Sequence, residues 1–102
     1  MELKPGTRLR SAACSTEIVV VKAPEGDVDL RCGGLSMLPL PDEGAPSGEP
    51  TPPFDEGTLV GKRYVSVDDS LEALCSKAGA GSLSVGGAAL LIKGAKPLPS
   101  SD

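Results

Sequence analysis

The sequence predicts an all-β fold, a small antiparallel barrel or sandwich built from two related halves. Thirteen glycines and ten prolines in 102 residues require many turns, which suits short strands better than helices. Between these turns, apolar and polar residues alternate with the period of a strand that buries one face. When the chain is shifted by 53 residues, the run 18–38 also matches the run 71–91 at turn glycines and alternate apolar positions. We therefore expect a single domain, residues 1–102, made of two β-meanders with pseudo-twofold symmetry.

The first half is expected to span residues 6–38. Its segment Glu17–Val21 is strongly β-forming and apolar on both faces, which is typical of a central strand. A turn should follow at 23–27, where Pro24 fixes one corner and Gly26 can adopt a positive φ.

The second half is expected to span residues 57–99. Alternation over 62–67 predicts a strand. The segment 71–78 is ambiguous, because the spacing of Leu71 and Leu74 also suits a short helix, whereas its counterpart in the first half is a strand. We favour a strand, since local propensity is a weak guide.

Each half should also contain one tight hairpin. Alternation over 28–32 predicts a strand that buries Cys32, and the glycine pair 33–34 provides a two-residue turn. In the second half the strand is expected at 83–85 and the turn at the glycine pair 86–87.

A proline-rich acidic strap, residues 39–56, is expected to join the halves. It contains six of the ten prolines and five acidic residues, but no basic residue. Proline fixes φ and lacks a backbone donor, so this segment cannot form a helix or a central strand. Because extended proline-rich segments lose little entropy on binding, the strap is a candidate partner-binding arm. The expected contact residues are Leu40, Pro52, Pro53 and Phe54.

Composition argues against several classes of function. The net charge is −4 and there is no basic stripe with interleaved aromatic residues, so we do not expect nucleic-acid binding. No apolar run approaches the roughly 20 residues of a membrane helix, and the N-terminus lacks the apolar core of a signal peptide. Three widely spaced cysteines are typical of a reduced, cytoplasmic protein.

The sequence contains no histidine, which removes the commonest general base and the commonest metal ligand. A Ser/His/Asp or Cys/His nucleophile therefore cannot form within this chain, and we expect a non-enzymatic protein that uses no cofactor. The cysteines are most simply small buried hydrophobic residues. A less favoured interpretation places Cys32 and Cys75 on adjacent strands as a metal site.

These observations predict a non-catalytic small β protein that acts as an accessory subunit or assembly partner of a larger complex. A thin, aromatic-poor core and free strand edges favour completion by another chain, either a protein partner or a further copy in a homo-oligomer. The alternative is a small-molecule or metal-binding domain with a cysteine-lined site between the two halves.

Overall fold

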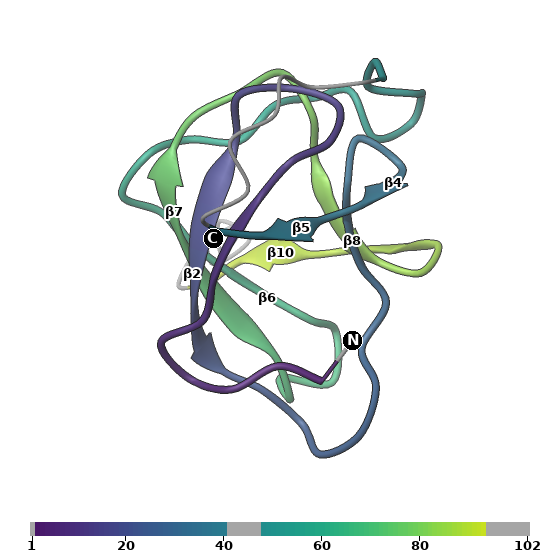
Figure 1. The fold of residues 1–102 in the computed structure, drawn as a ribbon. Coiled ribbons are helices and arrows are strands. Elements are labelled where there is room, and N and C mark those ends of the chain that lie inside the picture. Colours follow the sequence, from purple (N-terminus) through teal and green to yellow (C-terminus); the bar gives the residue numbers. More distant parts are fainter. Residues whose placement is uncertain (1, 41–47, 94–102) are drawn as a thin grey trace, which may run out of the picture.

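The computed structural model describes residues 2–40 and 48–93. Within these residues every regular element is a β-strand, and the strands form two antiparallel sheets rather than a closed barrel (Figure 1). The all-β class and the antiparallel pairing expected from the sequence are therefore confirmed. The strands are β1 Arg8–Arg10, β2 Glu17–Lys22, β3 Leu30–Cys32, β4 Leu35–Ser36, β5 Leu38–Pro39, β6 Arg63–Val65, β7 Glu72–Lys77, β8 Leu83–Val85, β9 Ala88–Ala89 and β10 Leu91–Ile92.

The larger sheet has six strands in the order β10-β6-β7-β2-β1-β5. Its centre is the antiparallel pair of β2 and β7, in which Ile18 lies opposite Cys75 and Val20 lies opposite Ala73. All four side chains are buried. Because β2 and β7 come from different halves of the chain, this pairing joins the halves directly.

The ambiguous segment 71–78 forms a strand, as predicted, and not a helix. β7 is paired on both sides, with β2 and with β6, so its backbone groups are bonded to neighbours in the sheet. Tertiary pairing of this kind outweighs the weak local preference for a helix.

The smaller sheet has four strands in the order β4-β3-β8-β9. Its central pair is β3 with β8, where Cys32 lies opposite Leu83. The two predicted hairpins are present, since β3 pairs with β4 and β8 pairs with β9. Both turns use the positive φ that glycine allows, at Gly33 (φ 68°) and at Gly86 (φ 57°).

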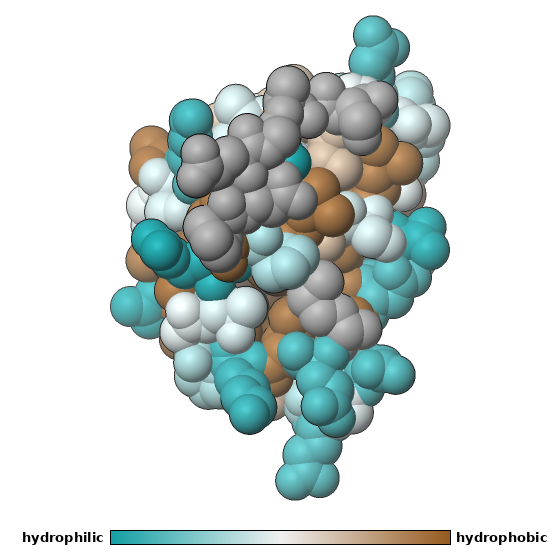
Figure 2. Space-filling view, viewed as in Figure 1, coloured by the Kyte–Doolittle hydropathy of each residue, from teal (hydrophilic) through white to brown (hydrophobic). Residues whose placement is uncertain are grey.

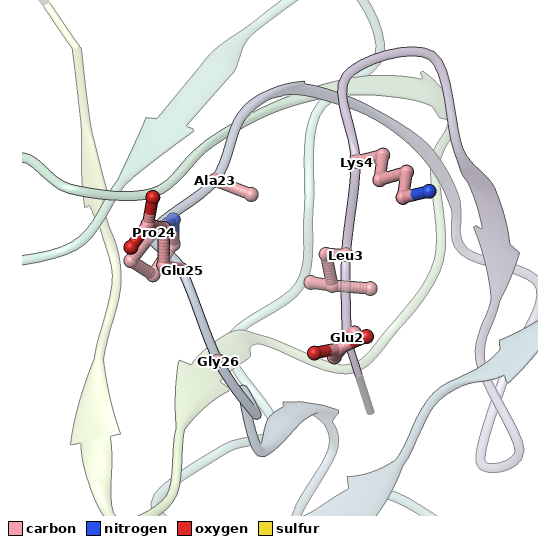
Figure 3. Close-up of a pocket in the computed structure, with 7 residues that line it drawn as sticks. All are labelled: Glu2, Leu3, Lys4, Ala23, Pro24, Glu25 and Gly26. Carbon is pink, nitrogen blue, oxygen red and sulfur yellow. The ribbon is translucent and has the colours of Figure 1, made fainter.

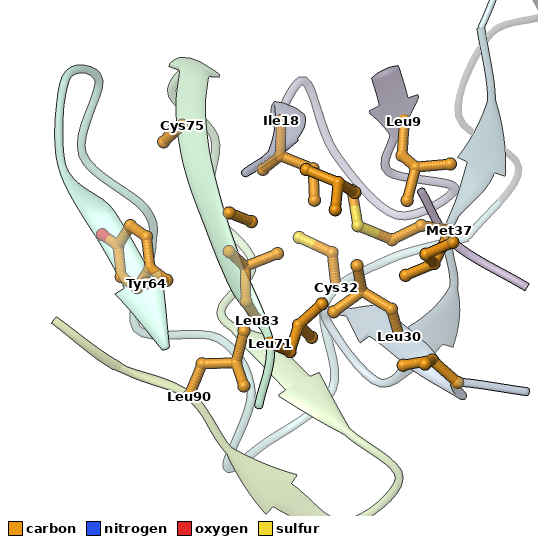
Figure 4. Close-up of a cluster of buried hydrophobic side chains, with 14 residues drawn as sticks. Leu9, Ile18, Leu30, Cys32, Met37, Tyr64, Leu71, Cys75, Leu83 and Leu90 are labelled. Carbon is orange, nitrogen blue, oxygen red and sulfur yellow. The ribbon is translucent and has the colours of Figure 1, made fainter. Parts of the chain in front are cut away.

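The core lies between the two sheets, whose buried side chains form one cluster (Figure 4). The larger sheet contributes Leu9 and Ile18, and the smaller sheet contributes Leu30 and Leu83. Tyr64 is the one aromatic ring of this cluster in the described part of the chain. Because both sheets supply side chains to a single cluster, the two halves share one core.

Some backbone hydrogen bonds recur at a fixed spacing along the chain. In the larger sheet the recurring bonds are 55 positions apart, and in the smaller sheet they are 53 positions apart. In the larger sheet, Gly6 N–H donates to Val20 C=O and Gly61 N–H donates to Cys75 C=O. In the smaller sheet, Met37 N–H donates to Leu30 C=O and Leu90 N–H donates to Leu83 C=O.

The repeat expected from the sequence, with its single shift of 53 residues, stays a prediction, because the connections that lead to β3 and β8 differ in length. Seven residues, 23–29, connect β2 to β3, whereas five residues, 78–82, connect β7 to β8.

The expected strap 39–56 is described in two pieces. Residues 41–47 lie outside the described residues, as do residues 94–99 of the expected second half. Pro39 belongs to β5, an edge strand of the larger sheet, which is where a strand tolerates proline.

The later piece of the strap, residues 48–56, lies against the hairpin turn of the first half. Thr51 N–H donates to Gly33 C=O at 2.9 Å, and Gly48 N–H donates to Ala12 C=O at 3.0 Å. An added Cβ at Gly33 would lie 3.0 Å from Pro50 Cα, which shows how closely the strap approaches this turn.

Figure 2 shows brown hydrophobic patches exposed between hydrophilic side chains on one face of the molecule. Single exposed hydrophobic side chains are normal on a protein surface. In the described residues no helix has the length and apolar character needed to cross a membrane. The large exposed hydrophobic residues are Val21, Leu59, Val60, Val67 and Leu91.

Candidate functional site

An apolar groove of about 310 Å³ lies beside the end of the proline-rich strap. It is bordered by β6 and β10 of the larger sheet and by β8 and β9 of the smaller sheet. Within the described residues, β9 and β10 are each the last strand of their sheet. The groove therefore borders an outer strand of each sheet. Its apolar lining includes Pro53, Phe54, Leu59, Tyr64, Leu90 and Ile92.

Of the four residues predicted to contact a partner, two line the groove and two do not. Pro53 and the half-buried Phe54 line the groove. Pro52 is exposed beside them but is not part of the lining. Leu40 is half-buried at the other end of the strap, where its N–H donates to Arg8 C=O at 2.9 Å.

Hydrogen bonds to the chain on either side fix the groove wall. Ser82 N–H donates to Phe54 C=O at 2.9 Å, and Glu56 N–H donates to Ser82 Oγ at 2.8 Å. Leu59 N–H donates to the hydroxyl of Tyr64 at 2.9 Å. The backbone at Leu59 is therefore held in place by a hydrogen bond, while the residue is 56% exposed.

Sequence reasoning missed Leu59 and the β10 residue Ile92 as lining residues. Leu59 and Val60 are two consecutive apolar residues in a segment without strand alternation, and both are exposed. Such a pair outside any regular element was the signal that could have identified this wall of the groove.

A second group of residues surrounds the thiol of Cys14, in the loop between β1 and β2. Cys14 Sγ lies 3.8 Å from Cys32 Sγ, 3.4 Å from Ser11 Oγ and 3.2 Å from Thr16 Oγ1. Gly81 N–H, from the loop between β7 and β8, donates to the same sulfur at 3.3 Å. The thiol pair therefore lies where segments of the two halves meet.

The two neighbouring thiols differ in how easily they ionise. Burial alone would raise the pKa of Cys14, but hydrogen bonds with the Ser11 and Thr16 hydroxyls and with the Thr16 and Gly81 backbone outweigh it, and its pKa falls from 9.0 to about 7. Burial raises the pKa of Cys32 to about 12, and the neighbouring Cys14 adds to this effect. Cys14 is thus the thiolate of the pair near neutral pH.

The structure places the sequence-predicted pair, Cys32 and Cys75, on β3 and β7 of the same buried cluster (Figure 4). Cys75 Sγ donates to Lys77 C=O at 3.3 Å, and the thiol contact of Cys32 is with Cys14. No contact between Cys14 and another cysteine was predicted from the sequence, because loop residues have no periodicity from which a contact can be inferred. Among the described residues no group of three or more Cys, Asp or Glu side chains is placed to hold a metal ion.

A larger hollow of about 530 Å³ separates the N-terminal segment 2–4 from the turn 23–26 (Figure 3). Its rim carries two carboxylates, Glu2 and Glu25, and the ammonium of Lys4. These three side chains are exposed, and only Leu3 of the lining is buried. The hollow therefore lacks the convergent buried polar groups of a ligand site.

Comparison with models of protein families gives no match, and neither curated protein sequences nor solved structures yield a significant one.

Proposed function

We propose that the protein is a non-catalytic interaction module that binds an extended segment of a partner protein in the groove beside Phe54. The observation that supports this most strongly is the position of the groove. Its apolar lining adjoins β9 and β10, and each of these strands has one side without a strand partner in the described part of the chain. A segment lying there can add backbone hydrogen bonds to its apolar contacts.

The size and chemistry of the groove indicate what such a segment contains. A volume of about 310 Å³ accommodates a few apolar side chains rather than a folded element. Burying one leucine-sized side chain contributes roughly 1.5–3 kcal/mol. The carboxylate of Glu56 also lines the groove, so a basic residue next to the apolar ones would complement it.

A duplicated unit, as expected from the sequence, would account for one groove being free. The strap covers the first hairpin, because a Cβ on Gly33 would lie 3.3 Å or less from Pro50. At Gly86, in the turn of the second hairpin, nothing in the part of the chain that the structure describes lies within 4 Å of an added Cβ. In this proposal the strap joins two related halves and covers one, while the edges of the other are left for a partner.

Binding by immobilised variants of the full chain tests this proposal. L59D and A89D introduce a carboxylate on two exposed side chains of the groove, and V67D does the same at an exposed residue outside it. We expect L59D and A89D each to reduce retention of the main bound protein from a lysate of the source organism about tenfold, because burying an unpaired carboxylate is costly. V67D should retain it fully, with thermal melts confirming that all three variants fold.

The proposal would be wrong if the wild-type chain retained no protein above a blank resin. It would also be wrong if V67D lost binding to the same extent as L59D and A89D.

A further inference from the structure

We propose that Cys14 and Cys32 are a reversible dithiol–disulfide site, in which Cys14 reacts first with a low-molecular-weight disulfide and Cys32 then displaces the adduct. Neither cysteine lines the groove, and the site does not depend on the proposed partner. Cys14 and Cys32 are both free thiols, and their sulfur atoms lie 3.8 Å apart.

The geometry requires only a small movement to close the bond. A disulfide has a sulfur–sulfur distance of about 2.05 Å, so the two atoms must approach by a little less than 2 Å. Cys32 ends β3 and is held by pairing with Leu35 and Leu83. Cys14 lies in the loop 11–16, which contains no strand, so this loop is the part that can supply the movement.

The surroundings divide the two chemical roles between the thiols. Cys14 is partly exposed, and the hydroxyls of Ser11 and Thr16 with the N–H of Gly81 surround its sulfur, which favours the nucleophilic thiolate. Cys32 is fully buried and reaches no external reagent directly. Cys32 can therefore attack the sulfur of Cys14, but only after that sulfur has formed a mixed disulfide with the reagent.

The reaction balances as two thiol–disulfide exchanges. The Cys14 thiolate attacks one sulfur of a disulfide RSSR, forming a Cys14–SR mixed disulfide and releasing one RS⁻. Cys32 then attacks Cys14 Sγ, loses its proton to solvent and expels the second RS⁻. Both released thiolates take up protons, so the protein dithiol and RSSR become the protein disulfide and two RSH.

Close packing by residues 79 and 81 disfavours a persistent adduct on Cys14. A Cβ on Gly79 would lie 2.9 Å from Cys14 Sγ, and one on Gly81 would lie 3.1 Å from Cys32 Sγ. A bulky adduct on Cys14 therefore crowds the loop 78–82, whereas the internal disulfide removes the adduct. This crowding favours displacement by Cys32 over a persistent mixed disulfide.

Oxidised glutathione is a suitable probe for the full-length reduced protein at pH 7.5. After incubation, free thiols are alkylated and tryptic peptides are analysed by mass spectrometry without reduction. The three cysteines fall on different tryptic peptides, because Lys22, Arg31, Lys62 and Arg63 separate them. We expect a linked pair containing Cys14 and Cys32, a protein mass lower by two hydrogen atoms, alkylated Cys75, and full reversal by dithiothreitol.

A C32S variant separates the two steps of the reaction. It should stop at a stable glutathione adduct on Cys14, while the C14S variant should keep Cys32 unreacted in the native state. A lasting glutathione adduct on wild-type Cys14, a link that includes Cys75, or no reaction under conditions that oxidise the unfolded chain would each overturn the proposal.

Discussion

At the scale of single residues, Cys14 has an environment that favours its deprotonated form. Hydrogen bonds lower its pKa to about 7 despite partial burial, whereas burial raises the pKa of Cys75. Thiolate, and not thiol, is the reactive species. The two cysteines should therefore differ in reactivity within one protein.

Alkylation of Cys14 by iodoacetamide should show a rate profile with its midpoint near pH 7. Below this pH the thiol is protonated and slow, and above it the thiolate predominates. Peptide mass spectrometry measures Cys14 and Cys75 in the same sample, and Cys75 should remain slow. S11A should move the Cys14 midpoint upward, because the side-chain hydrogen bond with Ser11, which lowers the Cys14 pKa, is lost. A Cys14 midpoint of about 8.5 or above, in the range of an ordinary thiol, would contradict this interpretation.

Glu72 is a buried carboxylate on the central strand β7. Its side chain is 4% exposed, and Lys93 Nζ donates to its Oε1 at 2.7 Å. Arg63 lies 3.6 Å from the other oxygen. A buried charge that loses a partner is costly, whereas exposed ion pairs contribute little.

We therefore expect K93M to lower the free energy of unfolding at pH 7 by about 1–3 kcal/mol, measured by urea denaturation. K77M provides the control, since Lys77 pairs with Glu17 at 4.0 Å near the surface and should change stability by less than about 0.5 kcal/mol. Adding E72Q to K93M should recover part of the loss. Equal effects of K93M and K77M would show that burial of Glu72 is unimportant.

At the scale of elements, the two hairpin turns differ in what covers them. Gly33 has a positive φ, and an added Cβ would approach Ala13 Cβ to 2.9 Å and Pro50 Cα to 3.0 Å. Gly86 also has a positive φ, but no atom of the described residues lies within 4 Å of an added Cβ. Alanine at each position thus separates backbone strain, present at both, from crowding by Ala13 and Pro50, present at Gly33 alone among the described contacts.

G86A should cost about 1–2 kcal/mol, the strain of a left-handed residue with a side chain. G33A should cost a further 1–3 kcal/mol or so, because overpacking against backbone is added to the same strain. Urea denaturation of both variants measures the difference. Indistinguishable stabilities would mean that the strap segment 48–51 does not rest on the first hairpin.

The alternation of apolar residues and the glycine pairs predicted most strands of the two sheets, including the burial of Cys32. The two-residue difference between the connections 23–29 and 78–82 was not predictable from matching glycines, because loop length is not constrained by pairing. The contact of Cys14 with Cys32 was missed for a related reason. It depends on how a loop folds over a strand 18 residues later, and no period encodes that.

At the scale of the whole molecule, the halves interlock rather than pack as separate units. β2 pairs with β7 in the larger sheet and β3 pairs with β8 in the smaller sheet, so each half contributes to both sheets. The remaining outer edges include β9 and β10 beside the groove. The sequence indicated edges and a strap as interaction elements, but it could not show that they meet at one groove.

Site-specific photo-crosslinking tests most directly the central claim, that a partner protein occupies this groove. A photoreactive phenylalanine derivative replaces Leu59 at the groove, or Val67 outside it, in the full chain within its source cells. Position 59 should give one dominant crosslinked product, whose mass and tryptic peptides identify an extended segment of another protein, and position 67 should not. Crosslinks from both positions alike, from neither, or only to a second copy of this chain would contradict the claim.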